Sequence, residues 1–226
     1  MGADDIRRAL RGSVYSKDSD ALLALIAGEE WPHDALQLIG DGLLDALRAG
    51  IGAAVPAACD CTTRLRERAW EGDHTLADAL DAKLGTAPLP FLRPLPVDLD
   101  LLTTALETER FTTTVRINTA TGEWADSDSE FDNPDDQDED GWLLVEGQGS
   151  RDGYHDMETF IDRLDDDTIA DLLAVAIQGR GAFRRFKDTL TRWPDLLEAW
   201  FSFSEDRQLG RARAWLADHG YTPTRG

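Results

Sequence analysis

The stretch "FTTTVRINTATGEWAD", Phe111 to Asp126, interrupts a chain that otherwise has the pattern of helices. Its β-branched residues alternate with other residues, which favours an extended strand over a helix. The segment "TATGE" then supplies turn residues, including Gly122. We therefore predict a β-hairpin with strands at Phe111–Ile117 and Glu123–Ala125, and a third strand at Trp142–Glu146, "WLLVE". A small antiparallel sheet within a mostly helical chain makes the predicted fold class α+β.

Before the hairpin, apolar residues recur at helical spacing in four segments. Leucines and isoleucines lie three, four or seven positions apart, which is typical of a helix with one buried face. Pro56 stands at a position near a helix start that proline tolerates. We predict helices at 18–28, 32–50 and 56–72, and a fourth that begins after Asp73 or Thr75. These helices should pack together as a small bundle.

A proline-rich segment, "TAPLPFLRPLPVD", runs from Thr86 to Asp98 and holds four of the nine prolines. Proline removes backbone donors and blocks helix, so the segment predicts an extended linker. We divide the chain accordingly into a helical N-terminal region at 1–85, a linker at 86–97 and an α+β domain at 98–226.

In the α+β domain, helical patterns surround the predicted sheet. A short helix is expected near Asp100–Leu106, and two amphipathic stripes follow Gly153. Asp166 or Asp167 should cap the second of these helices. A basic helix after Gly181 and a final helix opened by Pro194 complete the predicted set, all packed against the sheet.

The net charge of −21 in 226 residues restricts the classes of partner. So acidic a chain repels phosphate backbones and anionic membrane surfaces, which argues against general nucleic-acid or membrane binding. It remains compatible with basic protein partners, with divalent cations, with imitation of DNA and with salt adaptation. No apolar run has the roughly 20 residues that a membrane span needs. We expect a cytoplasmic protein.

Residues 126–140 form an acidic segment with no cation, and we predict a solvated loop there. Asp136, Asp138 and Asp140 precede Gly141 with the spacing of a calcium-binding loop. The position that should hold the last carboxylate is Gly147, and a strand pattern follows where a helix is needed. These acids are therefore a weak calcium candidate, and we expect no metal and no cofactor.

Cys59 and Cys61 are the only cysteines, separated by one residue. They could form half of a metal site, completed by His33 or His74. The alternative is a pair of reduced thiols on a helix, and the lack of a second cysteine pair favours it.

The stretch "QGRGAFRRFKDTLTRW", residues 178–193, gathers the most cations. Helical geometry places its aromatic and aliphatic residues on one face and most of its cations on the other. These cations either balance internal acids, such as Asp165–Asp167, or bind an external anion or acidic partner, for which arginine is well suited. The candidate partner- or anion-binding residues are Arg180, Arg184, Arg185, Lys187 and Arg192.

Several spaced motifs in the second half occur together in a known group. They are "TGE" at 121–123, "YHDMETFI" at 154–161, "GRGAFRRFKD" at 179–188, the pair Trp200 and Phe203, and "ARAWLADHG" at 212–220. From Phe111 to Tyr221 the chain resembles the bacterial uncharacterised protein family 0158. The resemblance implies a compact bacterial α+β unit, and it carries no catalytic residue.

The sequence contains no complete signature of an enzyme. "GSRDG" places its serine one position too early for a nucleophile elbow, and there is no complete phosphate-loop or dinucleotide pattern. We therefore expect a non-catalytic interaction or regulatory protein with an unidentified protein partner. Two alternatives remain open: a protein that binds phosphates through its arginines or mimics DNA through its acids, and a hydrolase or metal-dependent enzyme.

Overall fold

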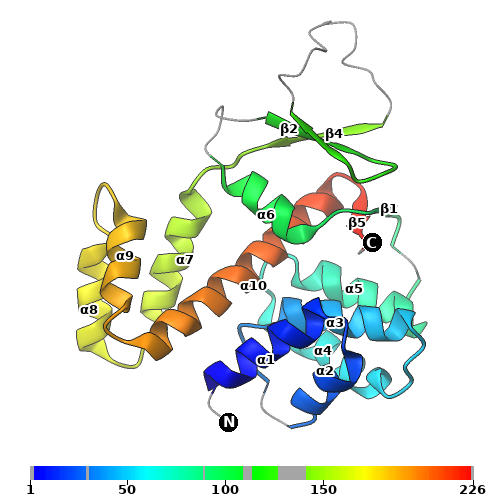
Figure 1. Cartoon of the computed structure of the whole chain (residues 1–226), viewed down its shortest axis with the longest axis horizontal. Coiled ribbons are helices and arrows are strands. Elements are labelled where there is room, and N and C mark those ends of the chain that lie inside the picture. The colour runs from blue at the N-terminus through cyan, green and yellow to red at the C-terminus, as the bar shows by residue number, and fades with distance from the viewer. Residues whose placement is uncertain (1–2, 29–30, 89, 109–113, 127–140, 225–226) are drawn as a thin grey trace, which may run out of the picture.

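The computed structural model describes residues 3–28, 31–88, 90–108, 114–126 and 141–224. These residues form ten helices and five short strands, so the predicted mostly helical α+β fold is confirmed. Figure 1 shows helices α1–α5 gathered in one bundle and α7–α9 at the opposite end, with the long helix α10 running between them. The antiparallel sheet lies beyond α6, near the far end of α10.

The N-terminal bundle contains one more helix than the sequence predicted. Helix α1 was missed because its sequence is mostly polar, yet Ile6, Leu10 and Val14 lie four residues apart and turn toward the core, where Leu10 and Val14 are buried. Asp18 caps α2 by accepting a hydrogen bond from Ala21 N–H at 2.9 Å. The five helices are α1 (Ala3–Tyr15), α2 (Ser19–Leu25), α3 (Leu36–Arg48), α4 (Ala54–Arg68) and α5 (Asp73–Leu84).

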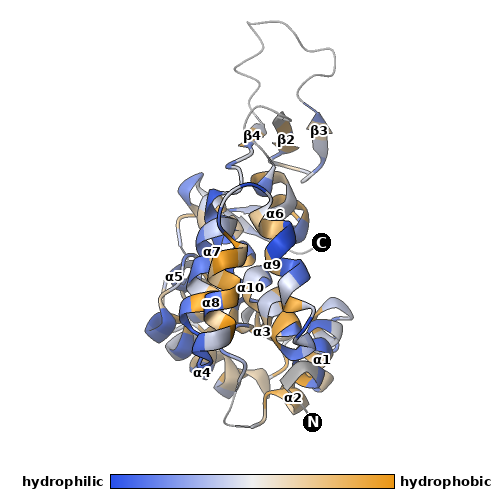
Figure 2. Ribbon diagram, turned by 90° about the vertical axis from the view of Figure 1, so that its left-hand side faces the viewer, coloured by the Kyte–Doolittle hydropathy of each residue, from blue (hydrophilic) through white to orange (hydrophobic). Residues whose placement is uncertain are grey.

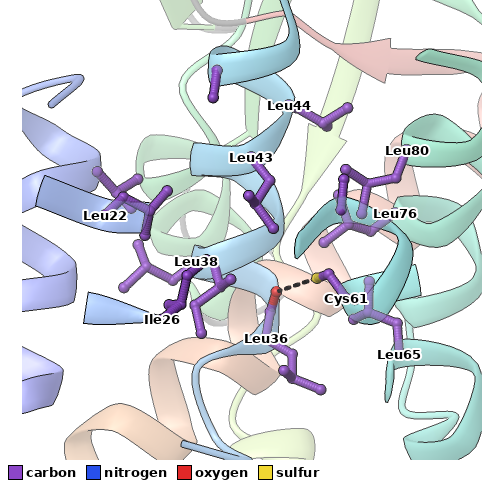
Figure 3. Packing of buried hydrophobic residues seen from close by; sticks show 14 of the residues in the cluster. Leu22, Ile26, Leu36, Leu38, Leu43, Leu44, Cys61, Leu65, Leu76 and Leu80 are labelled. Atoms are coloured by element: carbon purple, nitrogen blue, oxygen red, sulfur yellow. Dashed lines mark hydrogen bonds between the residues drawn. The ribbon is translucent and has the colours of Figure 1, made fainter. Parts of the chain in front are cut away.

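Helix α3 lies at the centre of this bundle, surrounded by leucines from its neighbours (Figure 3). Its two glycines allow that close packing. A Cβ atom on Gly40 would lie 2.5 Å from a methyl of Leu76, and one on Gly42 would lie 2.5 Å from a methyl of Leu22. A larger residue at either glycine must therefore displace the leucine side chain that packs against it.

The proline-rich segment contains a strand that the sequence did not predict. Strand β1 (Arg93–Leu95) pairs in parallel with the C-terminal strand β5 (Tyr221–Pro223). Arg93 lies over the ring of Tyr221, 4.6 Å from its centroid, and donates a hydrogen bond to its hydroxyl. A pair of three-residue strands separated by more than a hundred residues leaves no local signal in a sequence.

The predicted antiparallel sheet is present, in the order β3-β2-β4. Its strands are β2 (Thr114–Asn118), β3 (Trp124–Asp126) and β4 (Trp142–Glu146), and β4 has the predicted bounds. Ile117 and Val145 point to the buried face, where they pack with α6 (Leu99–Glu107) and the end of α10. Part of the predicted first strand, residues 111–113, lies outside the described residues.

The C-terminal helices form a second core built from aromatic rings. Phe186 packs edge-on against Trp200, with ring centroids 4.8 Å apart, and Phe160 and Phe203 complete the cluster. Asp166 caps its helix, as one of the two predicted candidates, through the N–H groups of residues 168 and 169. The helices are α7 (Arg151–Asp162), α8 (Asp167–Ala176), α9 (Ala182–Leu190) and α10 (Pro194–Asp218).

Helix α10, 25 residues long, also packs against the N-terminal bundle. At one point two backbones touch: a Cβ atom on Gly72, in the α4–α5 turn, would lie 2.1 Å from the carbonyl oxygen of Gly210. The segments on either side of the proline-rich stretch therefore share a tight interface. The proposed domain division at 86–97 stays a prediction.

None of the helices in the described ranges is long and apolar enough to cross a membrane.

Candidate functional site

Helix α9 presents two different faces, as its sequence pattern predicted. Phe186 and Leu190 are fully buried, and Phe183 and Trp193 are half-buried beside them. The cations of the segment lie on the exposed side. Gly181 provides the turn before the helix with a φ of 75°, a conformation that glycine adopts without strain.

Arg185 turns back onto the protein itself. Its Nε donates to the carbonyl of Ala176 at 3.0 Å and its Nη2 to that of Gln178 at 2.5 Å, while Nη1 donates to the carbonyl of Arg180. These carbonyls lie at the C-terminus of α8 and in the turn after it, where the helix dipole favours a positive charge. Arg185 therefore ties α9 to the end of α8, whatever other contacts it makes.

The other predicted site residues have few partners inside the protein. Arg184 lies 3.6 Å from Asp188, but its side chain is 88% exposed, so the pair contributes little to stability. Lys187 lies over the ring of Phe201, 5.9 Å from the centroid. Among the described residues, no side chain forms an ion pair with Arg180 or Arg192. Whether the set binds a partner stays a prediction.

Exposed apolar side chains lie on the helices on either side of α9. Leu172 and Val175 on α8 are 43% and 67% exposed, and Phe201 on α10 is 40% exposed. Figure 2 shows α8 facing the viewer with strongly apolar stretches. Helix α9, which carries the cations, packs against both α8 and α10, and Lys187 lies over the ring of Phe201. We call Leu172, Val175, Arg184, Lys187 and Phe201 the basic–apolar surface.

A buried charge cluster, which the sequence analysis missed, joins the N-terminal bundle to α10. Arg68 at the end of α4 binds both oxygens of Asp73 at 2.9 and 2.6 Å, and also binds Asp206 of α10 at 2.5 Å. All three side chains are at most 1% exposed. One guanidinium is thus shared between two buried carboxylates.

The cluster continues along α3. Gln37 donates from its backbone to Asp206 at 2.7 Å and from its side chain to Asp73 at 2.8 Å. The side-chain oxygen of Gln37 accepts from Arg213 at 3.0 Å, and Arg213 also binds Asp41 at 2.6 Å. Three carboxylates therefore face two guanidiniums, which leaves one uncompensated negative charge if every carboxyl group is ionised.

The pKa of Asp206 is raised within this cluster. Burial raises its pKa from 3.8 to about 6, although Arg68 and the backbone N–H of Gln37 act in the opposite direction. The carboxylate of Asp73 adds to the rise, because it shares Arg68 and repels a second negative charge. Asp206 therefore titrates near neutral pH in the folded protein.

A sequence signal for this cluster existed. Asp206 and Arg213 recur at helical spacing with the buried Leu209 and Leu216, so they lie on the face of α10 that packs against the rest of the protein. A charged residue within an apolar stripe requires a buried partner. The partner's identity could not be read, because Arg68 lies 138 positions away.

The sequence offered two metal candidates, the acids at 136–140 and the two cysteines. Asp136, Asp138 and Asp140 lie outside the described residues, so calcium binding there stays a prediction. Cys59 is exposed, whereas Cys61 is buried, and burial raises the pKa of its thiol well above the usual range. Over the described ranges, no group of three or more histidine, cysteine or acidic side chains could hold a metal ion.

A cavity of about 220 Å³ opens where the end of α1, α3, the start of α6 and β5 meet. Several of its polar groups already bind neighbours. The Tyr15 hydroxyl donates to Asp100 at 2.6 Å, and Arg48 binds Asp45 at 2.9 Å. Asp41, at its wall, holds Arg213 of the buried cluster. The cavity therefore borders the same interface that contains the charge cluster.

Fold and surface together define a mostly helical α+β protein with a basic–apolar surface and a charge cluster under its longest helix. Residues 122–225 match the model of the uncharacterised protein family UPF0158. A UPF0158 protein of Pseudomonas aeruginosa is 26% identical over 139 residues, which cover 58% of this chain and 88% of that protein. The resemblance predicted for the second half is thus confirmed. No solved structure gives a significant match.

The family match covers the C-terminal helices but not the N-terminal bundle. It includes α7–α10 and therefore the whole basic–apolar surface. It also includes Asp206 and Arg213, but their partners on α3 and α4 lie before residue 122. The N-terminal bundle thus supplies most of the buried charge cluster, namely Gln37, Asp41, Arg68 and Asp73, from outside the matched segment.

Proposed function

We propose that this chain is a non-catalytic interaction protein of the bacterial cytoplasm that binds a protein partner through the basic–apolar surface. The observation that carries the proposal is the position of exposed cations on the helix that packs between two helices with exposed apolar side chains, in a chain of net charge −21. Exposed apolar residues next to arginine are the composition of a protein interface.

The partner's chemistry follows from what the surface offers. A partner must offer an apolar stripe to contact Leu172, Val175 and Phe201. It must also offer carboxylates to pair with Arg184 and Lys187. An acidic amphipathic helix supplies both an apolar face and carboxylates. Long-range repulsion from the rest of this acidic chain makes close, specific contacts necessary for such a complex.

Nucleic-acid binding through the same helix is the weaker alternative. Base stacking needs exposed aromatic rings, but Phe186 is fully buried and Phe183 and Trp193 are half-buried. Only Phe201 offers a substantially exposed ring beside the cations of the described surface. Fully exposed Phe91 lies in the proline-rich segment, away from α9.

Two further observations support the non-catalytic and cytoplasmic parts of the proposal. The polar groups at the 220 Å³ cavity include Tyr15, Asp41 and Arg48, which bind neighbouring side chains of the protein. The free thiols of Cys59 and Cys61 suit a reducing compartment.

Site-specific photocrosslinking in the native host tests the proposed surface. A photoreactive residue at Val175 should give one discrete adduct, and one at Val55 should not. Val55 is a matched control, because it is also an exposed helical valine, 43% exposed, but lies on α4. Adduct formation should fall when Arg184 and Lys187 are both changed to Gln, and should weaken at high salt.

The possible results separate the alternatives. Equal adducts at Val55 and Val175, or an adduct that survives the double Gln variant, would contradict the proposed surface. An adduct to nucleic acid would favour the alternative reading. A folded double variant is expected, since Arg184 and Lys187 make only exposed contacts.

A further inference from the structure

A second surface lies at one edge of the antiparallel sheet, far from the basic–apolar surface on α8–α10 (Figure 1). Strand β4 is the outermost strand on that side, and among the described residues it pairs only with β2 (Figure 2). An edge strand carries N–H and C=O groups that point away from its sheet and can pair with another chain. With five residues, β4 offers a longer edge than β3, which has three.

The hydrogen-bond pattern shows which backbone groups of β4 point outward. The N–H of Thr119 donates to the carbonyl of Gly141 at 2.7 Å, so these residues form a bonded pair between the two strands. Bonded and non-bonded pairs alternate in an antiparallel ladder, so Leu143 and Val145 bond to β2. The backbone groups that point away from the sheet are those of residues 142, 144 and 146.

The end of α6 covers the next outward group along the chain. The N–H of Gln148 donates to the carbonyl of Leu106 at 2.7 Å. Within the described ranges, no backbone hydrogen bond outside the β2–β4 ladder involves residues 142–146. We call residues 142–146 the open edge of β4.

The other sheet of the protein has proline on both of its edges. The N–H of Arg93 donates to β5 and that of Thr224 donates to β1, each at 2.8 Å. The alternation along each strand therefore points Pro94 and Pro223 away from that sheet. Proline at an outward position prevents a further strand from pairing, as lysine on an edge also does. The open edge, "WLLVE", has neither.

The side chains of the open edge also favour contact with an extended segment. Leu144 is 46% exposed. Trp142 and Glu146 share its face, because side chains two positions apart in a strand point the same way. A strand added to β4 would cover Leu144 and satisfy the outward backbone groups. Binding by strand addition uses this combination of backbone pairing and side-chain contact.

The charge around the open edge indicates the chemistry of the partner. Residues 114–146 carry eleven acidic residues and one cation, Arg116. Three of the acids, Glu123, Asp126 and Glu146, belong to the described part of the sheet. Such a charge attracts a basic segment. It repels an acidic segment, and it also repels a second copy of this chain, whose edge has the same charge.

We propose that the open edge of β4 binds an extended basic segment of a partner protein by strand addition. The segment exchanges hydrogen bonds with the outward backbone groups, packs an apolar side chain beside Leu144, and brings its lysines or arginines near the acids of the sheet. This site is separate from the basic–apolar surface, and the proposal does not rest on the function of that surface.

A labelled heptapeptide of alternating lysine and valine residues is the probe for the open edge. Fluorescence anisotropy should show saturable binding, with an affinity that falls as the salt concentration rises, because opposite charges attract the peptide. A heptapeptide of alternating glutamate and valine residues has the same length and valine positions, and it should not bind. The proposal is wrong if the lysine peptide does not saturate the protein, or if both peptides bind equally.

Amide hydrogen exchange locates the bound strand. Residues 142, 144 and 146 should exchange more slowly in the complex, because their N–H groups gain an acceptor. Residues 124 and 126 point outward from β3, since Glu123 accepts from the N–H of Asn118 at 2.8 Å, and they are the internal control. Slowing at β3 equal to that at β4 would contradict the assignment of the binding edge.

Substitutions at Leu144 change the open edge without removing a donor of the β2–β4 ladder. Leu144→Pro should weaken binding of the lysine peptide roughly tenfold or more, because it removes an outward N–H and its ring obstructs the added strand. Leu144→Lys and Leu144→Glu are a matched pair that loses the leucine but keeps the N–H. Both should stay folded because residue 144 is exposed. The lysine variant should bind the peptide more weakly than the glutamate variant, and equal affinities would contradict the proposal.

Sedimentation of the protein without peptide tests whether a second copy occupies the edge. A monomer, or an assembly that Leu144→Pro leaves intact, agrees with a basic partner segment. A dimer that Leu144→Pro dissociates would overturn the proposal, because the edge would then bind another copy of this chain.

Discussion

Replacing Asp206 by Asn should make the stability of this protein less dependent on pH. The raised pKa means that the folded state holds the Asp206 proton more tightly than the unfolded chain does. The contribution of this group is therefore fully present below pH 3.8 and is lost as the pH rises through about 6. A shift from 3.8 to about 6 corresponds to about 3 kcal/mol of stability lost at neutral pH.

The physical origin of this loss is the burial of the Asp206 carboxylate, to which the neighbouring charge of Asp73 adds. Arg68 already binds both oxygens of Asp73, so an ionised Asp206 adds a second negative charge in a site that water does not reach. Asn keeps the size of the side chain and can still accept from the Gln37 N–H. The loss of the carboxyl group itself changes the free energy of unfolding by an amount that is the same at every pH. Only in the wild type does ionisation of residue 206 make this free energy depend on pH.

Urea unfolding of both proteins between pH 5 and 7.5 measures this difference. The wild type should lose about 1.5 kcal/mol relative to Asp206→Asn over that range. Asp218→Asn, an exposed change on the same helix, should run parallel to the wild type. A constant gap between wild type and Asp206→Asn would refute the reasoning, because it would mean that Arg68 keeps Asp206 ionised throughout.

Three further predictions concern the packing. Gly72→Ala should destabilise the protein far more than Gly85→Ala. Both glycines have positive φ, which costs alanine about 1–2 kcal/mol, but only at Gly72 does a methyl collide with the backbone of α10. Equal losses of stability in chemical unfolding would contradict the tight contact. Phe186→Ala should cost about 3–5 kcal/mol in the same assay, since its fully buried ring packs on Trp200, and a loss below 1 kcal/mol would mean that the core tolerates the cavity. Limited proteolysis should cut first within 86–97 or 126–140, and the fragments from a cut in 86–97 should co-elute because α10 holds them together, whereas first cleavage inside α7–α10 would show that the stable core lies elsewhere.

Much of the fold could be predicted because its signals are local. The hairpin turn, strand β4 and the cap of α8 each depend on residues within a few positions of one another. Helix α1 was missed because its buried residues are few and widely spaced among charges. The pairing of β1 with β5 could not be predicted, since it joins segments that are distant in the chain.

The candidate sites show the same limit. Helical periodicity separated the buried Phe186 and Leu190 from the cations of α9. It could not show that Arg185 folds back onto α8, because that contact depends on the turn between the two helices. The sharing of Arg68 by two carboxylates arises only when α10 meets other helices. Pairings of this kind are properties of the tertiary structure.

The buried charge cluster also has a consequence for the order in which the chain is synthesised. Arg68 and Asp73 leave the ribosome long before Asp206, which follows Arg68 by 138 residues. Helices α1–α5 can fold early, since they pack on one another, but Arg68 and Asp73 lack their partner on α10 until that helix has been made. Synthesis of α10 thus buries charged groups that the earlier helices leave exposed. A truncated product without α10 would leave Arg68 and Asp73 open to water.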